Sequence, residues 1–323
     1  MEYGSIHGVG KPVSRLILGS MIFHTDRQAQ TDELLDTFVA AGGTAIDLAN
    51  VYGRGQSEAA FGDWLRRRRE REQLVIIAKG AHHAGPDYMP RMTPEAIKGD
   101  LDLALERTGA GFADLYVLHK DVEEVPVGVI VDALDECARA GKATAVGGSS
   151  WTTARLGMAN CYAAAHGKAP FVVSSPNHSL AVPREPMWKH CVYLPGDEAA
   201  LAWYEQTQLP VLAWSSQARG FFSGLYAPGR GPDQDVLRVY DTPDNWQRLA
   251  RTRELARQLG CTHTQVALAW VLHQPFPVYA LVGPHTRAEM EDCLGALAVR
   301  LTGEQVAWLN LEQSGGETSA TAA

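Results

Sequence analysis

The chain has 323 residues and a formal net charge of −8, from 29 Lys and Arg against 37 Asp and Glu. Apolar residues make up 46% of the sequence, enough for a large hydrophobic core, so the composition excludes a globally disordered chain. The acidic balance argues against a nucleic-acid or anionic-membrane partner, because affinity for phosphate depends on excess Lys and Arg.

Five cysteines are spread along the chain without a C-x-x-C pair. This spacing argues against a disulfide framework or a thiolate zinc site and favours a reducing compartment. The first residues contain no apolar stretch typical of a secretory signal. No apolar run approaches the ~20 residues that span a bilayer. We therefore expect a soluble, cytoplasmic protein.

Short β-type runs alternate with helical patterns along the chain. Strands are predicted at 15–19, 44–48, 73–79, 113–119, 143–147, 171–174, 211–214 and 278–282. Helices are predicted at 32–41, 57–69, 152–165 and 245–259, with another ending at Gly141 and others beginning after Thr93, Thr262, Thr286 and Thr302. The last three threonines are each followed three residues later by Gln or Glu, the signature of a capping box.

Eight strands separated by helices imply a parallel sheet, and eight such units in about 300 residues favour a single (β/α)8 TIM barrel over a doubly wound sheet. One domain is expected over residues 1–311, followed by a disordered tail over 312–323. Two stretches, 175–199 and 215–244, are long for loops after the sixth and seventh strands, which is typical of lids and binding loops.

Polar side chains end three neighbouring strands of the predicted barrel, where barrel active sites lie. Asp47, Lys79 and His119 end the second, third and fourth strands, and Tyr52 follows Asp47 in its loop. A Lys ammonium lowers the pKa of a nearby phenol, ordinarily about 10, and an Asp keeps that Lys charged and oriented. The set suits general acid–base catalysis of a carbonyl–alcohol interconversion, although Asp47 and Lys79 alone also fit a structural ion pair.

These residues stand in the order and spacing of the catalytic tetrad of the aldo-keto reductases, a family that the sequence resembles over nearly its whole length. The matching stretches are IDLANVYGRGQSE, IIAKG and DLYVLH, with LILGSMIF near the start and ALVGPHTRAEMEDCLGAL near the end. The resemblance implies catalysis by Asp47, Tyr52, Lys79 and His119 in a reductase that uses NADP(H), or NAD(H), and no metal.

The resemblance also implies a cofactor site. In GGSSW, Ser149 and Ser150 would hold the carboxamide, and Trp214 would stack on the nicotinamide ring. The segment from Gly283 to Cys293 would hold the adenosine 2′-phosphate and the adenine. The expected cofactor residues are Met21, Asp47, Ser149, Ser150, Trp214, Ser215, Gln217, Arg219, Gly283, His285, Thr286, Glu289 and Cys293.

The sequence departs from the family pattern at several of these positions. Val173 falls near a Gln that contacts the carboxamide in relatives, and Ser150 replaces an Asn. Glu289 replaces an Arg near the 2′-phosphate, where it would either repel phosphate or only close the capping box with Thr286. His285 and Arg287 remain as phosphate partners, so NADP is expected and NAD stays open.

Candidate substrate contacts are aromatic or imidazole side chains after the strands: Phe23, His82, His83, Trp151 and Trp188. They favour a small polar or sugar-like carbonyl or alcohol, although the aromatic ones equally fit a packing role. With His24 and His119, the two adjacent histidines also fit a metal-dependent barrel hydrolase, but the last four strands end in no metal ligand. A further alternative is a non-catalytic, cofactor-binding regulatory barrel. The sequence allows a monomer or a homo-oligomer.

Overall fold

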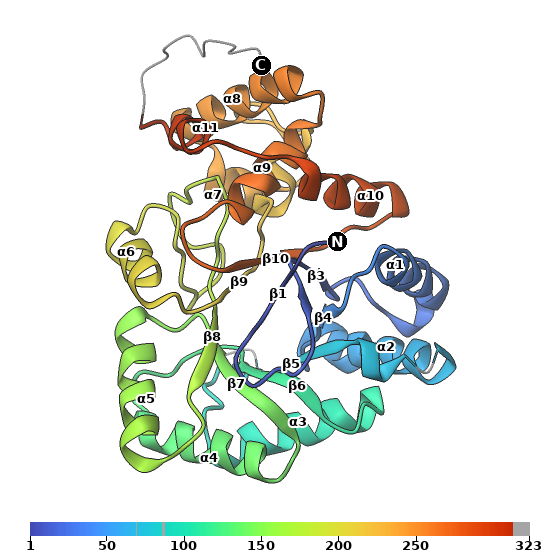
Figure 1. Cartoon of the computed structure of the whole chain (residues 1–323), viewed down its shortest axis with the longest axis vertical. Coiled ribbons are helices and arrows are strands. Elements are labelled where there is room, and N and C mark those ends of the chain that lie inside the picture. The colour runs from blue at the N-terminus through green and yellow to red at the C-terminus, as the bar shows by residue number, and fades with distance from the viewer. Residues whose placement is uncertain (69, 86–87, 313–323) are drawn as a thin grey trace.

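The computed structural model describes residues 1–68, 70–85 and 88–312. Eight parallel strands close into a barrel in the order β10-β3-β4-β5-β6-β7-β8-β9. Their bounds are β3 Leu16–Gly19, β4 Ala45–Asp47, β5 Val75–Gly80, β6 Ala113–Leu118, β7 Ala143–Ser149, β8 Phe171–Ser175, β9 Val211–Ala213 and β10 Val278–Val282. The predicted (β/α)8 barrel is confirmed (Figure 1).

Helices surround the barrel and follow its strands (Figure 1). They are α1 Gln28–Ala40, α2 Gln56–Arg68, α3 Pro94–Thr108, α4 Val127–Arg139, α5 Thr153–His166, α6 Glu198–Thr207, α7 Gln234–Tyr240, α8 Pro243–Leu259, α9 His263–Leu272, α10 Arg287–Gly295 and α11 Gly303–Leu309. Short 3-10 turns lie at η1 Thr25–Arg27, η2 Tyr52–Gly55, η3 Arg71–Gln73, η4 Ala218–Ser223 and η5 Ala296–Ala298. Within the part of the chain that the structure describes, none of the helices has the length and apolar character needed to span a membrane.

The hydrophobic core has two layers because successive strand residues point to opposite faces of the sheet. Ile17 of β3 faces the barrel interior, whereas Leu16 and Leu18 face the surrounding helices. The interior layer also contains Ile6, Val9 and Val13, which come from an unpredicted N-terminal hairpin.

That hairpin joins β1 (Tyr3–Gly4) to β2 (Val13–Ser14) and crosses one end of the barrel (Figure 1). Ser14 Oγ accepts hydrogen bonds from the backbone N–H groups of Thr44 and Ala45, where β4 begins. The hairpin therefore closes the amino end of the barrel and leaves the carboxyl end for function.

The long stretches after β8 and β9 contain helices that were not predicted. The short helix α7 lies wholly inside 215–244, with Asp233 accepting from the backbone N–H of Asp235 at its start. Helix α1 begins four residues before its predicted start, because the turn η1 leads directly into it. The tail predicted over 312–323 lies, beyond Glu312, outside the described residues, and the single domain over 1–311 stays a prediction.

The buried carboxylate of Asp114, in β6, joins the hairpin to the barrel floor. It pairs with Lys11 of the hairpin at 2.8 Å and with Arg71 at 2.9 Å, and it accepts a hydrogen bond from the backbone N–H of Ile76 at 2.9 Å. Removing one partner of a buried ion pair leaves the other charge uncompensated, which is strongly destabilising.

We expect Asp114→Ala to lower the free energy of unfolding by about 3 kcal/mol in urea denaturation. The matched control is Asp63→Ala, which removes an exposed pair with Arg66 and should cost less than about 1 kcal/mol. Equal losses in the two variants would contradict a structural role for the Asp114 cluster.

Candidate active site

Four polar side chains meet at the carboxyl end of the barrel. Lys79 Nζ, from β5, donates to Asp47 Oδ2 at the end of β4 at 2.7 Å and to the Tyr52 hydroxyl at 3.0 Å. The Tyr52 ring lies edge-on to the ring of His119, which follows β6, with centroids 5.6 Å apart. The structure thus brings the four residues together as the parallel strand order requires.

Burial controls the protonation of this cluster. Asp47 and Lys79 are each 2% exposed. Burial alone would lower the pKa of Lys79, but Asp47 and Tyr52 outweigh it and raise that pKa above its ordinary value. The pKa of Tyr52 is also raised, because burial outweighs the opposing charge of Lys79. Lys79 acts in the expected direction on the Tyr52 pKa, but burial outweighs its charge, so the phenol keeps its proton at neutral pH.

His119 is neutral for a related reason. Burial, followed by the charge of Lys79, holds its pKa well below the usual value. Its Nδ1 atom is buried and has no hydrogen-bond partner among the described residues. The imidazole can therefore donate or accept a hydrogen bond at neutral pH without carrying charge.

Imidazole and phenol rings continue from His119 across the mouth of the barrel. The His82 ring lies 4.8 Å from the His119 ring and 5.5 Å from the Tyr88 ring. His83 stacks against Tyr88 at 4.9 Å and against His190 at 5.1 Å. Burial lowers the pKa of His83 to about 4. Sequence reasoning missed Tyr88 and His190, because no strand end or spacing marks these loop positions.

A second cluster of polar groups centres on the carbonyl oxygen of Ser175. Ser149 Oγ donates to it at 2.8 Å and Trp214 Nε1 at 3.1 Å. Asn177 donates through Nδ2 to the Trp214 carbonyl at 3.3 Å, while its buried Oδ1 has no partner in the part of the chain described. Ser150, beside this cluster, has a left-handed backbone (φ 58°). Sequence reasoning missed Ser175, the last residue of β8, and Asn177, which lies two residues beyond it in the following loop.

A sequence model of the Aldo/keto reductase family matches residues 15–310. The chain belongs to this family. Similar proteins include an uncharacterized oxidoreductase, YrpG, from Bacillus subtilis, 27% identical over 98% of both chains. Versiconal hemiacetal acetate reductase from Aspergillus parasiticus is 24% identical over 96% of both chains. Aldo-keto reductase yakc [NADP(+)] from Schizosaccharomyces pombe is 26% identical over 81% of this chain and 76% of its own.

This aldo-keto reductase is an oxidoreductase that acts on carbonyl and alcohol groups. Its expected ring-stacking residue, Trp214, is half-buried between two aromatic side chains, Trp188 at 5.6 Å and Tyr193 at 5.5 Å. The Arg219 guanidinium lies 5.3 Å above the Trp188 ring and pairs with Asp233 at 3.0 Å. Ser215, the residue after Trp214, has a left-handed backbone (φ 49°).

The segment expected to hold the adenosine phosphate lies at the start of α10, after the exposed Gly283. Thr286 accepts from the backbone N–H of Glu289, but the Glu289 carboxylate accepts from the backbone N–H of His285 at 2.6 Å. A complete capping box therefore does not form here, in contrast to Thr262 with Gln265 and Thr302 with Gln305. Cys293 contacts the Gln217 side-chain oxygen at 3.5 Å.

Three further residues predicted to contact cofactor or substrate, Met21, Phe23 and Trp151, differ in their exposure. Met21 is 60% exposed in the loop after β3. Phe23 and Trp151 are buried in the outer core, and Trp151 Nε1 donates to the Lys120 carbonyl. Neither offers an open surface to a substrate, so burial favours the packing alternative for both.

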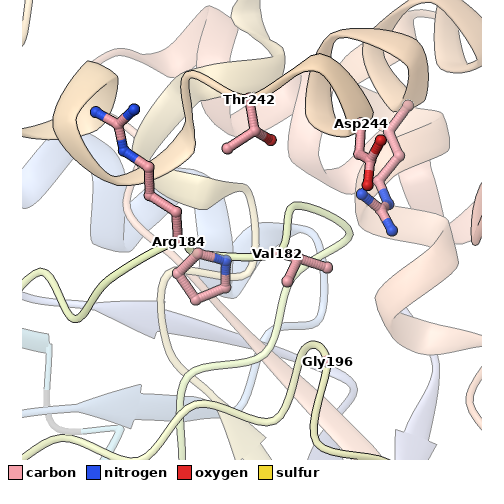
Figure 2. A pocket seen from close by; sticks show the side chains of 7 residues that line it. Val182, Arg184, Gly196, Thr242 and Asp244 are labelled. Carbon is pink, nitrogen blue, oxygen red and sulfur yellow. The ribbon is translucent and has the colours of Figure 1, made fainter.

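A separate cavity of about 340 Å³ lies between the loop after β8 and the start of α8. Figure 2 shows Val182 and Arg184 on that loop, opposite Thr242 and Asp244. No residue of the tetrad lines it. Within residues 1–68, 70–85 and 88–312, no group of three or more His, Cys, Asp or Glu side chains is placed to hold a metal ion.

The lowered pKa of His119 implies that the folded chain loses stability in acid. The unfolded chain binds a proton at His119 near pH 6.5, whereas the folded chain does not, so folding stability is lost as the pH falls below about 6.5. We expect His119→Gln to flatten this decline by up to about 1.4 kcal/mol per pH unit in urea unfolding between pH 6.5 and 4.5. His7→Gln, at an exposed position, is the control, and identical slopes for His119→Gln and the parent chain would refute the assignment.

Proposed function

We propose that this chain is an NAD(P)H-dependent aldo-keto reductase in which Tyr52 is the general acid and base for carbonyl–alcohol interconversion. The observation that carries the proposal is the 3.0 Å hydrogen bond from the buried Lys79 ammonium to the Tyr52 hydroxyl. Asp47 and His119 complete the catalytic set. Family membership supports the reaction class.

Residues of the second cluster fit a nicotinamide. The unpaired Asn177 Oδ1 is a buried acceptor suited to the N–H of a carboxamide, beside Ser149 and Ser150. Trp214 offers an aromatic face for the ring, and Ser215, Gln217 and Arg219 would line the pyrophosphate path. When bound, a reduced nicotinamide supplies a hydride to the carbonyl carbon.

Tyr52 supplies the proton in the reducing direction. Because its pKa is raised by burial, the phenol is protonated at neutral pH and can donate to the carbonyl oxygen as charge develops there. The neutral His119 imidazole can donate a second hydrogen bond to the same oxygen. In the oxidising direction the same phenol oxygen receives the proton from the alcohol.

Lys79 and Asp47 lower the free-energy cost of this proton transfer within a buried site. Once Tyr52 has given up its proton, the Lys79 ammonium lies within hydrogen-bond distance of the phenolate and stabilises its charge. Asp47, at 2.7 Å, fixes the Lys79 side chain and keeps it protonated. The two residues position and stabilise, and Tyr52 carries the proton.

For the substrate we propose a small polar or sugar-like carbonyl or alcohol. The support is the line of imidazoles beyond His119, since His82 and His83 offer hydrogen-bonding groups along the path to Tyr52. Trp188, 37% exposed, provides an aromatic face on the other loop, of the kind that stacks on sugar rings.

We expect Tyr52→Phe to lower kcat for carbonyl reduction by about 10²–10⁴-fold, because the ring remains but the transferable proton is lost. The loss of NADPH absorbance across a carbonyl panel measures turnover, and quenching of tryptophan fluorescence measures cofactor binding, which should persist. Tyr162→Phe, on α5, is the control and should keep the parental rate. An unchanged rate in Tyr52→Phe would remove Tyr52 from catalysis, and cofactor binding without turnover in the parent chain would favour a regulatory barrel.

We propose NADP as the cofactor, with NAD as an accepted alternative. The contacts at α10 limit the preference, because the Glu289 carboxylate occupies the backbone N–H of His285. Arg287 is paired with Glu291, one turn further along α10, at 2.8 Å, so its guanidinium charge is already partly compensated. A 2′-phosphate at this position would therefore meet a carboxylate and few free donors.

We expect Glu289→Gln to tighten binding of NADPH by about fivefold, because it removes a negative charge near the 2′-phosphate and keeps an amide oxygen for His285. Titration with NADPH, followed by tryptophan fluorescence, measures the change. NADH is the internal control and should bind the parent and the variant equally. A parallel gain for both cofactors would show that Glu289 does not face the phosphate.

A further inference from the structure

Lys120, the residue after His119, has a buried amino group with an unusual neighbour. The side chain is 4% exposed, and its Nζ atom lies 2.6 Å from the sulfur of Cys191. Nζ also donates to the carbonyl oxygen of Lys189 at 3.1 Å. No carboxylate pairs with it in the part of the chain described, so sulfur and one carbonyl are its polar surroundings.

The distance between nitrogen and sulfur is short for a hydrogen bond. N–H donors approach oxygen to about 2.7–3.2 Å, and sulfur is the larger atom. The same distance is too long for a direct bond, since even the bond between two sulfur atoms is about 2.0 Å. The gap between Nζ and Sγ therefore suits one bridging atom.

We propose that Lys120 and Cys191 are the two ends of an oxidative cross-link in which one oxygen joins Nζ to Sγ. A peroxide first oxidises the thiol to a sulfenic acid and releases water, so sulfur loses two electrons. Lys120 then gives an ammonium proton to solvent. A second peroxide accepts two electrons as the N–O bond forms between the amine and the sulfenic oxygen, releasing two waters. A dithiol in excess returns the four electrons and restores amine, thiol and water.

The position of the pair allows this chemistry. Cys191 is a partly exposed residue, whereas Cys137 and Cys293 are buried, so a small peroxide has a shorter path to Cys191. The amine is held against the sulfur by the Lys189 carbonyl, two residues before Cys191, so the loop presents both partners together.

The cross-link would act on the candidate active site. It would tie the loop after β8 to the end of β6, directly beside His119. His190, next to Cys191, already stacks on His83 at the barrel mouth. The bridged nitrogen would no longer carry the ammonium charge that contributes, after burial, to the lowered pKa of His119. Loop position and local charge would change in one step.

The test is mass spectrometry on the full chain before and after hydrogen peroxide, with and without a dithiol. We expect the intact mass to gain one oxygen and lose two hydrogens. Digestion should give one joined species that contains Lys120 and Cys191, and the dithiol should separate it. This readout needs no carbonyl turnover and therefore stands apart from the proposed function.

Matched variants complete the test. Cys191→Ser and Lys120→Arg should both lose the joined peptide, and Lys120→Arg keeps the positive charge. Cys161→Ser, at an exposed cysteine on α5, should retain it. The proposal is overturned by oxidised Cys191 in an unlinked peptide, by a link that lacks the oxygen, or by the same linked mass in Cys191→Ser.

Discussion

The buried ion pair between Lys79 and Asp47 is the constraint on which the site depends. Two charges removed from water are costly unless each has a partner at close range. Here the ammonium is paired at 2.7 Å and has one further donor contact, to the Tyr52 hydroxyl. A closed parallel barrel supplies this arrangement, because neighbouring strands end at the same rim and hold Asp47 and Lys79 side by side.

Desolvation then fixes the protonation of the remaining groups. The same absence of water that strengthens the Lys79–Asp47 pair keeps the proton on Tyr52 and off His119. Such a phenol would donate its proton only when negative charge develops on an adjacent oxygen. Its imidazole neighbour, held neutral, adds a directional hydrogen bond without competing for the cation.

The sequence predicted the barrel well, because buried strands and capped helices leave local signals. Because parallel strands end at the same rim, the strand ends alone predict that Asp47, Lys79 and His119 lie close together, as the structure places them. Their catalytic roles stay a prediction. The sign of the Tyr52 pKa shift was not found, because burial depends on the packing of the whole rim. Asn177, Tyr88 and His190 were missed, since their loops are positioned by long-range contacts. The Glu289 carboxylate accepts from the backbone N–H of His285 and not from that of Thr286, a difference that the spacing of the motif does not encode.

The N-terminal hairpin separates the two ends of the barrel by role. Ile6, Val9 and Val13 fill the floor, and Lys11 anchors there through Asp114, while Lys79, Asp47, Tyr52 and His119 meet at the opposite rim. In barrels of this kind the amino face serves stability and the carboxyl face serves activity. Stabilising substitutions at the amino end can therefore accumulate without altering the site at the carboxyl end. The loops at the carboxyl end can likewise vary in sequence without loss of the barrel's stability.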